Sequence, residues 1–287
     1  MSRPEQTDSA GQTVDLPSDA PAAPATPAPL TSASPGFDLG LTWLGHSSVL
    51  LDLPQLRLLT DPFLRDHLGP LRRHGPVPDP GAIGRVDVVA ISHAHPDHFD
   101  PGSLQALAGD PLVVVPRGLG GNVRRLGLRT HELEVGETVE LGSGCRITAV
   151  PARHWRWPVA PRARTVGYLV ESADRAGIYF AGDTAPFGAM RELTGRVDLA
   201  LLPVGSWGPH VSPGHLTPKT AAAVARVLGA RVAVPIHWGT LYPPKLDRWF
   251  GDRLREPASQ FVTWAERLTP TTEVHALDPG GTTRVRL

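Results

Sequence analysis

The chain has 287 residues, and its 28 lysines and arginines balance 28 aspartates and glutamates, so that the formal net charge is zero. The hydrophobic share of 41% excludes a wholly disordered or fibrous chain, and no apolar run approaches the roughly 20 residues that span a bilayer. One cysteine, Cys145, excludes an intrachain disulfide and a cysteine-rich zinc module, and the neutral charge argues against a nucleic-acid partner.

Residues 1–36 differ in composition from the rest of the chain. The stretch 17–36 consists almost entirely of Pro, Ala, Ser and Thr, which offer little to bury, so ordering it would lose entropy without return. We predict a disordered Pro/Ala-rich tail over 1–36 and one domain over 37–287. The opening also lacks the basic start and apolar stretch of a secretion signal, which with the single thiol predicts a cytoplasmic location.

From residue 37 onward, short apolar runs alternate with turn residues, as is typical of strands. No internal repeat is present, so a solenoid is not expected. The predicted strand segments are Leu41–Leu53, Leu56–Pro62, Val86–His93, Pro111–Pro116, Cys145–His154, Thr165–Ser172, Gly177–Asp183, Asp198–Gly205 and Arg231–Trp238.

Three helices separate or follow these strands. Asp100–Pro101 and Thr217–Pro218 each combine a side chain that caps a helix with a proline at the first helical position, and Gly229 fits the end of the second helix. A third helix is predicted over 257–268. The last residues, 273–287, contain a DPGG turn between two short β-type runs and predict a hairpin. The domain is therefore of the mixed α/β class.

The strongest feature of the sequence is the run HAHPDH, directly after the apolar segment that ends at Ile91. Residues two apart on an extended chain point the same way, so His93 and His95 could bind one ion. The turn at the proline then redirects Asp97 and His98 toward a neighbouring position. Imidazole and carboxylate groups suit zinc, and burying four such groups unpaired would cost several kcal/mol.

Three more residues of ligand type each follow a β-type run. His154, Asp183 and His237 are weak signals singly, because a histidine at a strand end is commonly an ordinary hydrogen-bonded side chain. Together with HAHPDH they gain weight, since open α/β sheets bind ligands at the carboxyl ends of strands. Gly182, beside Asp183, would let the backbone come close to a metal.

HAHPDH, His154, the AGDT segment and PIHWG together resemble the metal signature of the metallo-β-lactamase superfamily, over about Leu41–Thr240. The resemblance implies an αβ/βα four-layer sandwich, two mixed β-sheets flanked by helices, with two zinc ions in a cleft at one edge. Manganese or iron could replace zinc. The resemblance assigns His93, His95 and His154 to one ion and Asp97, His98 and His237 to the other, with Asp183 between them.

Such ions imply hydrolysis. Bound water would ionise near neutral pH, and two ions could share the resulting hydroxide while polarising the bond under attack. Asp97 would orient the nucleophile while it binds the metal. The expected protein is a dinuclear zinc hydrolase.

LTWLGHSSVLL, YFAGDT and IHWGT most resemble the N-acyl-phosphatidylethanolamine phospholipase D branch, and a sugar-phosphate lactonase branch shares several segments. The expected substrate is small and anionic, a phosphodiester or an ester or lactone. The segments after AGDT and around SWGPHVSPGH differ from the phospholipases, which argues against a phospholipid. Two alternatives stay open: a nuclease or RNA-processing member of the superfamily, and a metal-binding scaffold without catalysis.

Several other residues have two interpretations each. His215 aligns with a histidine of the phospholipase branch and would contact substrate or protonate a leaving group, or else serve the start of the helix. Asp61 would orient a ligand histidine or form a turn, and a structural role is favoured for His46. Cys145 is expected to be a buried strand residue.

Tryptophans and arginines gather near the predicted ligands. The tryptophans would line a substrate pocket or, more often, fill the core, and the arginines would bind an anion or lie in solvent. These residues are Trp155, Trp157, Trp207 and Trp238, and Arg153, Arg156, Arg162 and Arg164.

Overall fold

The strands that the structure describes form two seven-stranded sheets and one three-stranded sheet. The computed structural model describes residues 38–141, 144–154, 163–208, 211–245 and 251–287. These belong to one unit, Pro35–Leu287. The predicted tail over 1–36 lies outside the described residues and stays a prediction.

The first sheet has the order β17-β1-β2-β3-β6-β7-β8. Neighbours from β17 to β3 are antiparallel, and those from β3 to β8 are parallel. Its strands are β1 (Asp38–Gly45), β2 (Ser48–Leu53), β3 (Leu56–Thr60), β6 (Val88–Ala90), β7 (Leu112–Pro116), β8 (Thr130–Leu133) and β17 (Thr282–Arg286).

The second sheet has the order β16-β14-β13-β12-β11-β10-β9, parallel from β16 to β12 and antiparallel from β12 to β9. Its strands are β9 (Thr138–Glu140), β10 (Arg146–Pro151), β11 (Val166–Glu171), β12 (Gly177–Phe180), β13 (Leu199–Pro203), β14 (Val232–Ile236) and β16 (Glu273–Val274). The small sheet joins β15 (Leu241–Tyr242), β5 (Leu71–Arg73) and β4 (His67–Leu68).

Alternating side chains of the first sheet are buried on both faces. Val49 and Leu51 belong to the core that includes the second sheet, whereas Leu50, Leu59 and Val89 pack with the first group of helices. That group is α1 (Pro80–Ile83), α2 (Pro101–Ala106) and α3 (Gly120–Arg124). Because a strand's side chains alternate between faces, each apolar run serves two layers.

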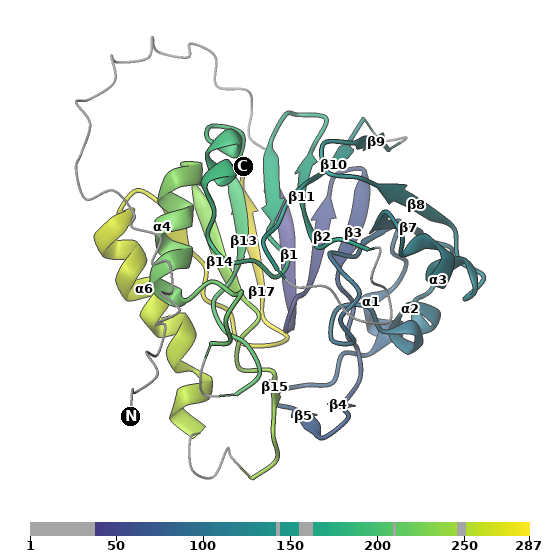
Figure 1. The fold of residues 1–287 in the computed structure, drawn as a ribbon, viewed down its shortest axis with the longest axis horizontal. Helices are drawn as coiled ribbons and strands as arrows, with labels where there is room; N and C mark the ends of the chain where they lie inside the picture. The colour runs from purple at the N-terminus through teal and green to yellow at the C-terminus, as the bar shows by residue number, and fades with distance from the viewer. Residues whose placement is uncertain (1–37, 142–143, 155–162, 209–210, 246–250) are drawn as a thin grey trace, which may run out of the picture. The chain divides into compact units, whose positions relative to one another are not determined.

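The helices on the other side are α4 (Pro218–Leu228), α6 (Glu256–Leu268) and the short 3-10 helix η1 (Gly188–Leu193); η2 (Gly251–Leu254) precedes α6. Figure 1 shows α4 and α6 on one side of the strands and α1, α2 and α3 on the other. The predicted four-layer αβ/βα sandwich is therefore confirmed. None of the described helices is long and apolar enough to cross a bilayer.

The predicted helix ends are confirmed. Asp100 Oδ2 accepts a hydrogen bond from Ser103 N at 2.9 Å, and Thr217 Oγ1 accepts one from Thr220 N at 3.2 Å. Gly229 ends α4 in the left-handed conformation, with φ 68°. Local side-chain chemistry thus determines where these helices begin and end.

Two local predictions are wrong. The segment predicted as one strand over 41–53 is split into β1 and β2, because a turn at Gly45–Ser47 reverses the chain. The predicted hairpin over 273–287 does not form: β16 pairs with β14 in the second sheet, and β17 pairs with β1 in the first. The DPGG turn instead carries the chain from one sheet to the other.

Candidate metal centre

The HAHPDH segment follows β6 and turns sharply at the edge of the first sheet. His95 O accepts hydrogen bonds from the backbone of His98 at 3.0 Å and of Phe99 at 2.8 Å. The turn sets the rings of His93 and His98 with their centroids 4.1 Å apart. Both of these rings are buried, as is Asp97, whereas His95 is half-buried.

The other three predicted ligands reach the same place from the second sheet. Nε2 of His237, after β14, lies 3.3 Å from Nε2 of His98, and Nε2 of His154, after β10, lies 3.3 Å from Nδ1 of His95. Asp183, after β12, lies between them, with carboxylate oxygens 3.2 Å from Nε2 of both His98 and His237. The structure therefore brings all seven predicted residues together.

The donor atoms form overlapping groups in which every atom lies within 4.8 Å of the others. Among the described residues, one four-membered group is His93, His95, His154 and Asp183, and another is His46, Asp97, His98 and His237. The first contains the three histidines that the resemblance assigns to one ion. The second contains the other three predicted ligands and adds His46.

Two ligand histidines are oriented by backbone carbonyl groups. Nδ1 of His154 lies 3.1 Å from Gly214 O, and Nδ1 of His237 lies 3.1 Å from Gly205 O. A carbonyl oxygen only accepts hydrogen bonds, so Nδ1 carries the proton in both rings. The neutral rings therefore present the lone pair of Nε2 to the cluster, as a metal ligand must.

Asp61 orients two further histidines, one directly and one through Ser92. Its Oδ2 accepts hydrogen bonds from Nδ1 of His98 at 2.6 Å and from Ser92 Oγ at 2.5 Å. Ser92 Oγ in turn accepts from Nδ1 of His93 at 2.9 Å. Of the two interpretations of Asp61, the structure favours the orienting one, although its φ of 31° also suits a turn.

Gly182 lies where the end of β12 meets the HAHPDH segment. Its φ is +57°, and a Cβ there would lie 2.6 Å from Cβ of Ser92. This glycine lets the backbone approach Ser92, which places Asp183 beside His93. Its approach to a metal stays a prediction.

His46 bonds to the cluster through both its side chain and its backbone. Nε2 lies 2.7 Å from Asp97 Oδ2, and the backbone oxygen accepts a hydrogen bond from His237 N at 2.8 Å. The residue has φ 55°, in the turn between β1 and β2. The sequence favours a structural role for His46. The structure adds a direct contact with the candidate ligand Asp97.

Three buried atoms of the cluster have no hydrogen-bond partner among the described residues. They are His93 Nε2, Asp97 Oδ1 and Asp183 Oδ1. Leaving such groups unsatisfied costs about 1–3 kcal/mol each, more when the group is charged. A cation bound to these atoms would remove that cost, so the donor set fits a divalent metal.

Electrostatics favour the same interpretation. Burial lowers the pKa of His93 and brings that of His154 to about 4, so both rings are neutral at pH 7. Burial opposes ionisation of Asp97 and Asp183, but neighbouring histidines outweigh it and hold the pKa of both carboxyls well below the usual range. For His98, burial is outweighed by Asp183 and other carboxylates, which raise its pKa well above normal. The cluster thus favours positive charge at its centre.

His215 adjoins the cluster without capping α4. Its Nε2 lies 3.1 Å from Asp183 Oδ2 and its Nδ1 lies 3.1 Å from Ser212 O. The helix cap is made by Thr217 and Thr220, so the capping interpretation of His215 is not supported.

The aromatic residues divide between core and cleft. Trp238 is buried and packs on Trp43 with ring centroids 5.0 Å apart, as core filling predicts. Trp207 is 43% exposed and donates a hydrogen bond from Nε1 to Asp97 Oδ2 at 2.9 Å. Cys145 is buried, as predicted. Trp155 and Trp157, and also Arg156 and Arg162, lie outside the described residues.

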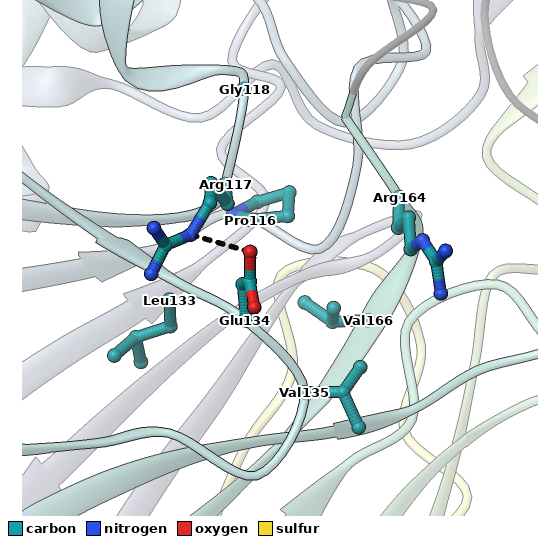
Figure 2. Close-up of a pocket in the computed structure, with 8 residues that line it drawn as sticks. All are labelled: Pro116, Arg117, Gly118, Leu133, Glu134, Val135, Arg164 and Val166. Atoms are coloured by element: carbon teal, nitrogen blue, oxygen red, sulfur yellow. Dashed lines mark ion pairs between the residues drawn. The ribbon is translucent and has the colours of Figure 1, made fainter.

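A cavity of about 460 Å³ lies at the same edge of the first sheet, between β7, β8 and the start of β11. Figure 2 shows Arg117 paired with Glu134 on one side of it and Arg164 apart from that pair. Arg164 is exposed and has no ion pair within the described part of the chain. Val166, in the cavity wall, donates its backbone N–H to Ser92 O at 3.0 Å, which links the cavity to the residue before His93.

Sequence reasoning missed the roles of Ser92 and Trp207. Ser92 stands beside His93 in the chain, and a hydroxyl next to a ligand was an available signal. For Trp207 the sequence predicts a pocket wall or core filling, and nothing local predicts that its indole meets Asp97, 110 residues earlier.

A profile of the β-lactamase superfamily domain matches residues 56–238. An uncharacterized protein of Mycobacterium tuberculosis is 33% identical over 241 residues, covering 76% of this chain. This chain spans 64% of that relative's length. A UPF0173 metal-dependent hydrolase of Opitutus terrae is 36% identical over 208 residues, 70% of this chain and 85% of the relative.

A third relative is the N-acyl-phosphatidylethanolamine-hydrolyzing phospholipase D 1 of Caenorhabditis elegans, 30% identical over 245 residues, 75% of this chain and 68% of the relative. Among solved structures, the metallo hydrolase Igni18 of Ignicoccus hospitalis matches with a TM-score of 0.70 at 21% identity. The match covers 88% of this chain and 100% of the Igni18 chain. At that identity the likeness shows the fold.

Proposed function

Because the chain belongs to the β-lactamase superfamily, we propose that it is a metal-dependent hydrolase that binds two divalent ions, zinc in the first place. The observation that carries the proposal is the convergence of Nε2 of His98, His154 and His237 on the Asp183 carboxylate. In His154 and His237 a carbonyl group holds Nδ1, so each ring presents the lone pair of Nε2 to the cluster.

One ion would be held by His93, His95 and His154 and the other by Asp97, His98 and His237, with Asp183 shared. When bound, such ions would lower the pKa of water toward neutrality and polarise the bond under attack. Asp97 would orient the nucleophile while it binds the metal, since its carboxylate lies 3.2 Å from Nε2 of the ligand His98. His215 has acceptors at both ring nitrogens, so it would carry a proton at Nε2 and donate it to the leaving group.

Arg164 in the wall of the cavity of Figure 2 favours a small substrate with negative charge. The residues that line this cavity include no candidate ligand, and the hydrogen bond from Val166 N to Ser92 O joins it to the HAHPDH segment. A guanidinium without a carboxylate partner can bind a phosphate or carboxylate in bidentate fashion, and Arg164 fits that description among the described residues. The name of the Caenorhabditis relative favours a phosphodiester, with an ester or lactone as the other choice.

A metal-depletion assay tests the proposal. Protein treated with a chelator should lose hydrolysis of bis(p-nitrophenyl) phosphate and of a generic lactone, and added zinc should restore it. Asp97→Ala should abolish turnover while the circular dichroism spectrum is kept, and the exposed Asp174→Ala should be the matched control. Full turnover in metal-free protein, or in Asp97→Ala, would contradict the proposal.

A further inference from the structure

The connection between β13 and α4 contacts the candidate ligands from outside the cluster. We call its described residues, 204–208 and 211–217, the β13–α4 loop. These described residues make four hydrogen bonds to the cluster, each to a different candidate ligand, and the four ligands include members of both groups. They join Gly205 O to His237, Trp207 Nε1 to Asp97, Gly214 O to His154 and His215 Nε2 to Asp183.

Within this loop, Trp207 has the most specific contact. Asp97 Oδ2 accepts two N–H groups, from His46 Nε2 at 2.7 Å and from Trp207 Nε1 at 2.9 Å. The other oxygen, Oδ1, is buried and has no partner. Nε2 of His98 and Nε2 of His237 also lie 3.2 Å and 3.7 Å from Oδ2. The two donors therefore define the rotation of the carboxylate beside both ligand rings.

We propose that Trp207 is a positioning residue that holds the Asp97 carboxylate in the orientation in which it binds a divalent cation, within a loop that orients ligands of both groups. This rests on the proposed function, because it presumes that the cluster binds metal. Trp207 is 43% exposed whereas Asp97 is 1% exposed, so the indole is the part of this arrangement that reaches solvent. Its removal should therefore disturb Asp97 without disturbing the fold.

The loop also lies close against His237. A Cβ at Gly205 would come within 2.8 Å of His237 O and 3.1 Å of Trp238 Cβ. Gly205→Ala must therefore displace the loop from the cluster, and we expect weaker binding at both groups, since the same loop carries Gly214 and Trp207. Trp207→Phe, in contrast, removes only the indole donor.

The experiment is a zinc titration of metal-depleted protein, with a chelating dye as competitor. Wild type should bind two ions. Trp207→Phe should bind one as wild type does and the other about 10- to 100-fold more weakly, the cost typical of losing a partner that orients a ligand. Trp264→Phe on α6, whose ring packs against Lys219 and Arg267, is the matched control and should bind as wild type does.

The outcomes separate this inference from the proposed function. Two ions bound with unchanged affinity by Trp207→Phe would overturn the positioning role and leave the proposed function standing. No divalent ion bound by wild type would overturn both. Replacing zinc by cobalt adds a second readout, because the absorption bands of the weakened site should change in Trp207→Phe and not in Trp264→Phe.

Discussion

The side chains of His46 and Asp97 are both buried and are joined by a hydrogen bond of 2.7 Å between Nε2 and Oδ2. The two residues are 51 positions apart, one in the turn between β1 and β2 and the other in HAHPDH. The pKa of His46 is lowered to about 3, mainly by burial and next by His237. The ring is therefore neutral above pH 5, and its Nε2 proton lies toward the carboxylate.

Replacing His46 should weaken metal binding without unfolding the protein. His46→Asn suits the positive φ of 55° but is too short to reproduce the Nε2 contact with Asp97. We expect about 10- to 100-fold lower affinity for one zinc ion, measured by dye competition. The exposed His131→Asn should bind as wild type does. Equal affinities in the two variants would count against this role of His46.

Asp61→Asn should disable His98 as a ligand. The amide group would place an N–H donor near Nδ1 of His98, which itself donates to Asp61 Oδ2 at 2.6 Å. The proton of His98 would then move to Nε2, the atom that faces the cluster. We expect elemental analysis to show the loss of one ion, and NMR to show changed signals of the imidazole nitrogens. The control variant Asp174→Asn should show neither change.

Acid should release the two ions at different pH values. The folded pKa of His154 is about 4, mainly through burial, below its ordinary 6.5, so protons compete for this ligand only near pH 4. At His98 burial is outweighed by carboxylates that raise the pKa, so metal must displace a proton and affinity falls as pH decreases through neutrality. Dialysis at stepwise lower pH should yield a one-ion form that retains the ion at His93, His95 and His154. Simultaneous loss of both ions near pH 6.5 would contradict this prediction.

Arg164→Gln should affect binding of charged substrates alone. Arg164 lies in the cavity of Figure 2 without a carboxylate partner among the described residues, whereas Arg117 pairs with Glu134 at 2.9 Å. We expect KM for a phosphodiester or carboxylate-bearing ester to rise about tenfold, the effect of losing about 1.4 kcal/mol of binding. KM for a neutral ester and kcat for both should stay unchanged. An equal rise for neutral and anionic substrates would exclude an anion site at Arg164.

Much of the fold could be predicted, because local chemistry decides it. The apolar runs form the buried strands. Asp100 and Thr217 cap their helices through hydrogen bonds to residues three positions later, so these caps do not depend on distant parts of the chain. The hairpin over 273–287 failed for the opposite reason. The DPGG turn reverses the chain, but it does not determine which strands pair. β16 pairs with β14 and β17 pairs with β1, and both partners are distant in the sequence.

The same distinction applies to the site. His154, Asp183 and His237 could be predicted because each stands at the end of an apolar run, where strands deliver side chains to a sheet edge. The contacts of His46 and Trp207 with Asp97 could not, since they depend on how two loops from different sheets meet.

Anomalous diffraction from crystals of the zinc-loaded protein would test the central claim most directly. We expect two zinc peaks, one beside His93, His95 and His154 and the other beside Asp97, His98 and His237, with Asp183 near both. A single peak elsewhere on the protein, or no zinc at this cluster, would contradict it.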